Sequence, residues 1–162
     1  MTDILRLLLI ILLLTISLAA HFLVVGALFA NRVERTHRVI NQMSGRAFGV
    51  GLVNFLFFGV IAIALFSVAE NAGGFIKGIL TITALLVTGL LAVLLSVGLT
   101  GMVNVFSERF FSDMAPWKRN FWGAVILCFA CALPFVGWFL LLPYVSFVGM
   151  GAFILGFFQR DI

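Results

Sequence analysis

The sequence predicts an all-α fold, a polytopic transmembrane helical bundle of three long spans and a C-terminal helical hairpin broken at proline and glycine. Hydrophobic residues make up 64% of the 162-residue chain and charged residues 10%, with a mean hydropathy of +1.26, far outside the range of soluble domains. The apolar residues also form long runs separated by short polar segments. We therefore expect one integral membrane domain over residues 1–162, with membrane segments near 4–30, 47–69, 76–105, 117–133 and 138–158.

The first apolar run, residues 4–30, is long enough to span a bilayer. Arg6 and the leucine-rich residues 7–14 also resemble the start of a secretory signal peptide, and a possible cleavage site follows at the small residues Ser17, Ala19 and Ala20. The apolar character nevertheless continues through Phe29. This continuity favours an uncleaved signal anchor over a cleaved signal peptide.

Basic residues gather in the segments on either side of the second and third apolar runs. The first of these segments, residues 31–46, reads either as a solvated loop or as a helical extension with arginines along one side. Because they lie in short segments between apolar runs, we interpret the basic residues as topology signals and contacts to anionic lipid, not as a nucleic-acid surface. The predicted contacts to lipid headgroups are Arg32, Arg35, Arg38, Arg46, Lys118 and Arg119.

The second span, residues 47–69, is preceded and opened by Gly45 and Gly49. This spacing of four is the small-residue pattern that lets two membrane helices approach closely. We therefore expect helix packing at this pair. A short link with Gly73 and Gly74 follows and predicts a tight turn between antiparallel helices.

The third span, residues 76–105, is the predicted centre of the bundle. Every fourth residue along it is small or weakly polar, which in a helix forms one continuous ridge. Small side chains on such a ridge let another backbone approach closely inside a bilayer. The ridge residues are Ala84, Thr88, Ala92, Ser96, Thr100 and Asn104.

The last apolar stretch, residues 121–158, is too long for one span. As a single helix it would extend roughly 55–60 Å, about twice the hydrocarbon thickness. It must fold back or lie partly along the interface, and Pro134 with Gly137 predicts the turn of a hairpin. A break at Pro143 is the alternative, and Pro143 also fits a kink within the second arm.

Lysine and arginine are distributed unequally among the polar segments. Residues 31–46 hold four of them and residues 106–120 hold three, whereas the link between the second and third spans holds only Lys77. The positive-inside rule then places segments 31–46 and 106–120 in the cytoplasm of a bacterial inner membrane, with the N-terminus outside. A C-terminal hairpin returns Arg160 to the cytoplasmic side, in agreement with this count.

The C-terminal third carries a recurrent pattern of tryptophan, glycine and proline. Trp122-Gly123 is followed by Leu133-Pro134-Phe135-Val136-Gly137-Trp138 and then by Gly149-Met150-Gly151-Ala152. The pattern resembles the multi-pass membrane module of unknown function that is often fused to, or encoded beside, bactofilin-type polymer-forming cytoskeletal domains. The resemblance implies a membrane anchor or scaffold and supplies no catalytic residues. This chain lacks the repetitive β-rich segment of the fused arrangement.

Few residues offer chemistry. Cys128 and Cys131 form a CxxC inside an apolar segment, where we expect inert buried thiols because no second Cys or His pair accompanies them. His21 lies inside the first span, and an intramembrane ionisable residue is a functional hypothesis by default. It is either a hydrogen-bond partner in helix packing or an axial ligand to haem or a bacteriochlorophyll-type pigment, and we expect no other cofactor and no metal.

The sequence predicts no enzyme, because it shows no nucleotide-binding loop, paired intramembrane carboxylates or Ser/His/Asp arrangement. Three functions remain open. The first is a non-enzymatic scaffold or accessory subunit that packs against other integral membrane proteins or itself, with lipids around it. The second is a homo-oligomeric channel or transporter, and the third is a pigment- or haem-binding subunit that uses His21.

Overall fold

A computed structural model of the chain describes residues 2–133 and 135–158, and the side chains of these residues except Thr2, Asp3 and Leu7. Within those residues it is helical, without strands, which confirms the all-α prediction. The elements are α1 (Thr2–Leu28), α2 (Ala30–Asn71), α3 (Gly74–Phe110), α4 (Pro116–Ala132), the π-helical segment η1 (Val136–Leu141) and α5 (Leu142–Phe158).

Four helices of the described chain are long and apolar enough to cross a membrane. They cover Ile4–Leu28, Ala30–Asn71, Gly74–Phe110 and Val136–Phe158, the last of which joins η1 to α5. Helix α4 has only 17 residues, or about 25 Å of helix, and is shorter than these spans. The chain is therefore a multi-pass membrane protein.

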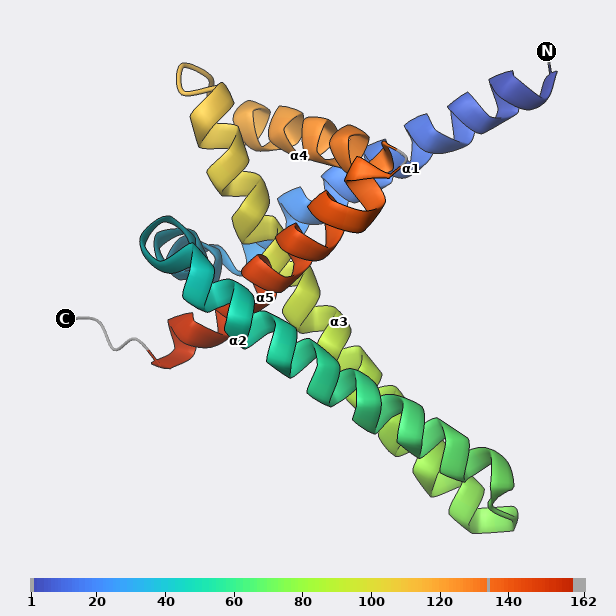
Figure 1. Cartoon of the computed structure of the whole chain (residues 1–162). Coiled ribbons are helices and arrows are strands. Elements are labelled where there is room, and N and C mark those ends of the chain that lie inside the picture. Colours follow the sequence, from blue (N-terminus) through green and yellow to red (C-terminus); the bar gives the residue numbers. More distant parts are fainter. Residues whose placement is uncertain (1, 134, 159–162) are drawn as a thin grey trace.

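The helices spread apart toward one side of the molecule and converge on the other. Figure 1 shows α1 running to one corner and the antiparallel pair of α2 and α3 running to another. The start of α2, the link between α3 and α4, and the C-terminal end of α5 all lie on the opposite side, which we call the converging side. We call the far part of the helix pair, residues 52–93, the α2–α3 arm.

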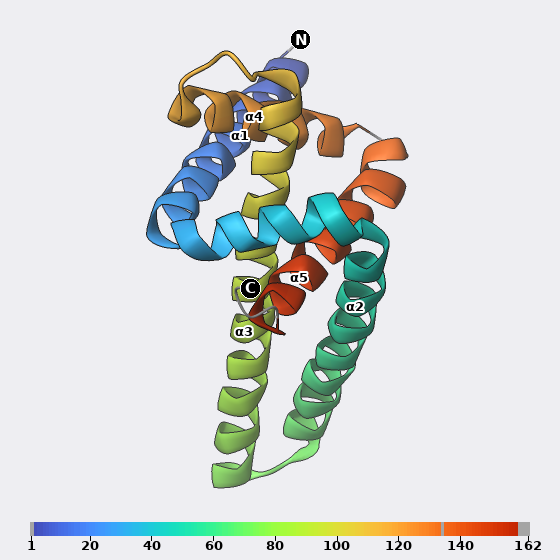
Figure 2. The same cartoon turned by 90° about the vertical axis from the view of Figure 1, so that its left-hand side faces the viewer.

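Helix α2 bends sharply at Met43, whose backbone angles of φ −142° and ψ 45° are not helical. The part before the bend lies across the converging side, and the part after it runs beside α3 (Figure 2). Residues 31–42, for which the sequence left a loop or a helical extension open, are thus helical. The bend turns this segment out of the direction of the span that follows.

Helix α5 lies between α2 and α3 at backbone contact distance. A Cβ built on Gly151 would collide with backbone atoms of Ala47 and Gly51 in α2, and one on Gly149 would collide with backbone atoms of Gly98 in α3. Side chains two positions apart in an α-helix point about 200° away from each other, since each residue advances the helix by about 100°. The Gly-Met-Gly sequence therefore gives α5 two opposite faces without side chains, one for each neighbour.

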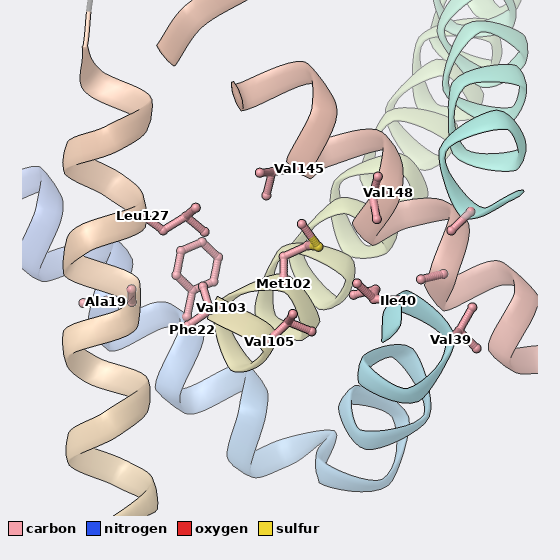
Figure 3. Packing of buried hydrophobic residues seen from close by; sticks show 13 residues of the cluster. Ala19, Phe22, Val39, Ile40, Met102, Val103, Val105, Leu127, Val145 and Val148 are labelled. Atoms are coloured by element: carbon pink, nitrogen blue, oxygen red, sulfur yellow. The ribbon is translucent and has the colours of Figure 1, made fainter. Parts of the chain in front are cut away.

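The main hydrophobic cluster lies where all five helices meet. Figure 3 shows its side chains converging from each helix, with Met102 of α3 near the centre. The labelled residues are Ala19, Phe22, Val39, Ile40, Met102, Val103, Val105, Leu127, Val145 and Val148. Because α3 is in contact with α1, α2, α4 and α5, it is the helix on which the others pack.

The chain reverses direction between α4 and α5. The predicted turn residue Pro134 lies outside the described residues, but Phe135 beside it has a positive φ of 67° and Gly137 is buried against the carbonyl groups of Ala130 and Cys131. Figure 1 shows α4 and α5 running in opposite directions from this point. The C-terminal stretch therefore folds back, with a short first arm and a longer second one.

The helix continues through Pro143, which is therefore not a break. Directly before it, the N–H of Leu142 bonds the carbonyl of Gly137, five residues back, in the wider turns of η1. Proline has no N–H to donate, and its ring would clash with the carbonyl four residues earlier in a regular α-helix. The π-helical turns relieve this conflict, as such bulges do at irregular points of helices.

Candidate functional site

The predicted ridge of α3 is divided between packed and exposed positions. Thr88 and Ala92 are exposed on the α2–α3 arm, Ser96 and Asn104 are partly covered, and Ala84 and Thr100 are buried. The Thr88 hydroxyl donates to the carbonyl of Ala84 at 2.8 Å, so its polar atom is satisfied within its own helix. At Thr88 and Ala92 the ridge therefore presents only small side chains, and no helix of the described chain covers them.

His21 joins α1 to this ridge. Its Nε2 atom forms a hydrogen bond of 2.7 Å with the Ser96 hydroxyl, across the interface between α1 and α3. One turn further on, the methyl group of Thr100 lies 3.5 Å from the position that a Cβ on Gly26 would take. The contacts correspond to the first of the two roles that the sequence allows for His21, a partner in helix packing.

We expect His21→Leu to remove this bond and lower the free energy of unfolding by about 1 kcal/mol. Ser96→Ala removes the same bond from the other side, and the double variant is expected to lose no more than either single variant. Thermal unfolding in mild detergent measures all three. A double variant whose loss equals the sum of the two single losses would show that the bond contributes nothing.

A polar cluster ties α2, α3 and α4 together on the converging side. The carboxylate of Glu108 lies 2.8 Å from Nε2 of His37 in α2 and 3.2 Å from Nη2 of Arg119 in α4. Beside it, the Ser107 hydroxyl lies 2.9 Å from Oδ1 of Asn120. Glu108 therefore bridges the two basic segments, and these segments lie on the same side of the bundle.

The six predicted headgroup residues are spread over this converging side. Arg38, Arg46 and Lys118 are exposed, whereas Arg32, Arg35 and Arg119 are partly buried. The guanidinium of Arg32 lies 4.1 Å from the ring centre of Phe157, a cation–π contact that attaches the start of α2 to the end of α5. Contact of the exposed cations with lipid phosphates stays a prediction.

The glycine pair Gly45 and Gly49 lies away from the other helices. A Cβ on either would meet nothing within 4 Å, whereas the close approach to α5 occurs at Ala47 and Gly51. Both pairs have the same spacing of four. They point to opposite sides of α2 because one pair is shifted by two positions along the helix from the other. Within the described chain, helix packing thus uses the other pair, which the spacing alone does not distinguish.

An apolar cavity of about 400 Å³ lies between α1, α4, η1 and α5, and Leu99 of α3 also lines it. Its floor includes the buried side chains of Phe22, Leu127 and Val145, and its rim includes the exposed Leu18 and Trp138. The predicted inert thiols of Cys128 and Cys131 are free and lie in its wall. This cavity could not be predicted from the sequence, because a cavity forms where side chains of different helices fail to meet.

The size of the cavity has an energetic consequence. Closed and empty, a void of this volume would cost about 10 kcal/mol at roughly 24 cal/mol per Å³. That approaches the whole stability of an ordinary domain, about 5–15 kcal/mol. The exposed rim shows that the cavity is open, so the surrounding medium fills it.

Metal-ligating side chains do not gather in the part of the chain that the structure describes. Among residues 2–133 and 135–158, no group of three or more His, Cys, Asp or Glu could hold a metal ion. His21 bonds Ser96, and His37 bonds Glu108. The features with functional potential are therefore the exposed part of the α3 ridge, the basic residues of the converging side and the apolar cavity.

Comparisons with known proteins add no assignment. The sequence matches no protein-family model, and neither the curated proteins nor the solved structures gave a match. The resemblance to the bactofilin-associated membrane module therefore stays a prediction.

Proposed function

We propose that this protein is a non-enzymatic membrane scaffold or accessory subunit that packs against other integral membrane proteins, or against copies of itself. The supporting observation is the exposed ridge surface at Thr88 and Ala92 on the α2–α3 arm. Both side chains are small, and no helix of the described chain covers them. A surface of small side chains accepts a second membrane helix at close backbone distance.

The shape of the arm supports the same proposal. In both views the α2–α3 arm extends beyond α1, α4 and α5 (Figures 1 and 2). Large apolar residues of α3 are also exposed on this arm, and they include Ile82, Leu85, Leu86, Leu90 and Val93. A helix pair without further cover inside its own chain is free to pack with another chain in the bilayer.

The basic side supports an anchoring role at a charged membrane surface. We place residues 31–46 and 106–120 in the cytoplasm of a bacterial inner membrane, where their cations meet anionic lipid. A cytoplasmic assembly, of which a bactofilin-type polymer is the example suggested by the sequence, would then be held at this side. Glu108 fixes the spacing between the two segments through His37 and Arg119.

The Ala92→Leu variant tests the proposal. Ala92 is exposed, so a leucine there is expected to retain the fold while it adds bulk to the small-residue surface of α3. We expect association with the partner to fall at least tenfold, or by about 1.4 kcal/mol. The measurement is the native mass of the protein purified from its own membrane in mild detergent.

Val93→Leu is the matched control, since Val93 is exposed on the same helix but lies off the ridge. This variant is expected to keep the native assembly. Unchanged assembly in Ala92→Leu would contradict the proposal. The same preparation separates the other two functions, because a channel gives ion flux in liposomes that contain this chain alone, and a pigment subunit gives visible absorbance that His21→Leu abolishes.

A further inference from the structure

We propose that the cavity between α1, α4, η1 and α5 binds one acyl chain of a membrane phospholipid, lengthwise, with the headgroup left outside. The inference is independent of the scaffold function. It rests on the shape of the cavity, on the chemistry of its wall and on where its mouth lies relative to the spans.

The cavity is elongated along three helix segments that run side by side. On α1 its lining extends from Ile11 to Phe22, a rise of about 16 Å. On the facing side it begins at Trp138 in η1 and continues to Ser146 in α5, while α4 contributes residues 127–132. A length well above the width of a single chain suits one extended hydrocarbon chain better than a compact ring system.

The wall offers hydrocarbon contact and almost nothing else. None of the lining residues is charged. The Thr15 hydroxyl donates to the carbonyl of Ile11 at 2.8 Å, so it offers the cavity no free donor. The wall therefore recognises the chain of a lipid and leaves the identity of its headgroup open.

The position of the mouth selects a phospholipid chain from the membrane. The helices α1 and Val136–Phe158, which form two sides of the cavity, are both candidate membrane spans. The rim residues Leu14, Leu18 and Trp138 are exposed, so they border the lipid phase. Trp138 stands at the start of its span, the level at which tryptophan is enriched beside lipid headgroups, and a chain can enter there with its headgroup at the interface.

A photoreactive lipid tests the site directly. The protein is placed in phospholipid vesicles that carry a small fraction of phosphatidylcholine with a diazirine in its acyl chain, and the crosslinked peptides are mapped by mass spectrometry. We expect crosslinks concentrated on residues 11–22 of α1 and 127–132 of α4. Cys128→Phe fills the cavity and is expected to reduce these crosslinks at least fivefold.

Ile126→Phe is the matched control, because Ile126 is an exposed residue of the same helix outside the lining. Its crosslinks are expected to equal those of the unchanged protein. Leu18→Trp narrows the mouth from an exposed position and reduces the same crosslinks even where Cys128→Phe does not fold. Crosslinks that spread evenly over all exposed apolar surfaces would overturn the proposal. So would crosslinks that are unchanged in both Cys128→Phe and Leu18→Trp.

A second readout separates a phospholipid chain from other occupants. Cys128 and Cys131 are the two cysteines of the chain, and both line the cavity. We expect one phospholipid per chain to stay bound in native mass spectra. With this lipid bound, a lipophilic maleimide is expected to label these thiols at least threefold more slowly than in the lipid-free protein. A retained isoprenoid, or thiols shielded only when another protein is bound, would contradict the proposal.

Discussion

We expect the Gly51→Ala variant to lose at least 3 kcal/mol of unfolding free energy, because the added methyl group would collide with the backbone of α5. The new Cβ would collide with the carbonyl group of Phe147 in α5. Backbone atoms cannot rotate aside as a side chain can, so α2 and α5 would have to move apart along the whole crossing. Thermal unfolding in mild detergent measures the loss.

Gly49→Ala is the control for this prediction. Gly49 lies two residues earlier in the same helix, and a Cβ there meets nothing within 4 Å. Alanine favours a helix over glycine by roughly 1 kcal/mol, so this variant is expected to be as stable as the unchanged protein or slightly more so. Equal losses in the two variants would show that α5 does not pack on α2 at Gly51.

The second large effect is an all-or-none pattern of surface labelling. In a Cys128→Ser and Cys131→Ser background, single cysteines at Arg38 and Lys118 are expected to react with a membrane-impermeant maleimide from one side only. The reason is that Glu108 holds both segments together through His37 and Arg119. Intact and inverted membrane vesicles give the two directions of access.

Phe75 and Phe135 provide the opposite pattern. Both are exposed, at 84% and 78%, and they stand at the ends of α3 and α4 that are remote from Glu108. Phe75→Cys and Phe135→Cys are expected to react from the other side of the membrane, with at least a tenfold preference. Reaction of Arg38→Cys and Lys118→Cys from different sides would disprove the arrangement of the two basic segments.

Much of the fold follows from lengths alone. The apolar runs fix how many helices the chain needs, because a bilayer sets the length of a span. The stretch after Phe121 exceeds one span, which predicts the reversal near Gly137 without any knowledge of contacts. That the small residues of α3 form one row could also be predicted, since a period of four depends only on helix geometry, whereas packing of this row against a partner stays a prediction.

The faces used for packing were not readable in this way. Gly45 and Gly49 have the spacing of a packing motif, yet the close contact is made by Ala47 and Gly51. Four-residue spacing says that two residues share a side of a helix, but the bend at Met43 and the position of α5 decide which side is covered. The cavity could not be predicted for a related reason, since it depends on the angles between α1, α4 and α5.

The position of α5 has a consequence for the order in which the molecule forms. Helices α1 to α4 precede α5 in the chain, so a ribosome releases them into the membrane first, and in the two-stage view they are inserted before they associate. Until α5 arrives, Gly51 of α2 and Gly98 of α3 lack the partner that fills the space between them. The nascent protein is therefore an open set of helices, and synthesis of α5 completes its assembly.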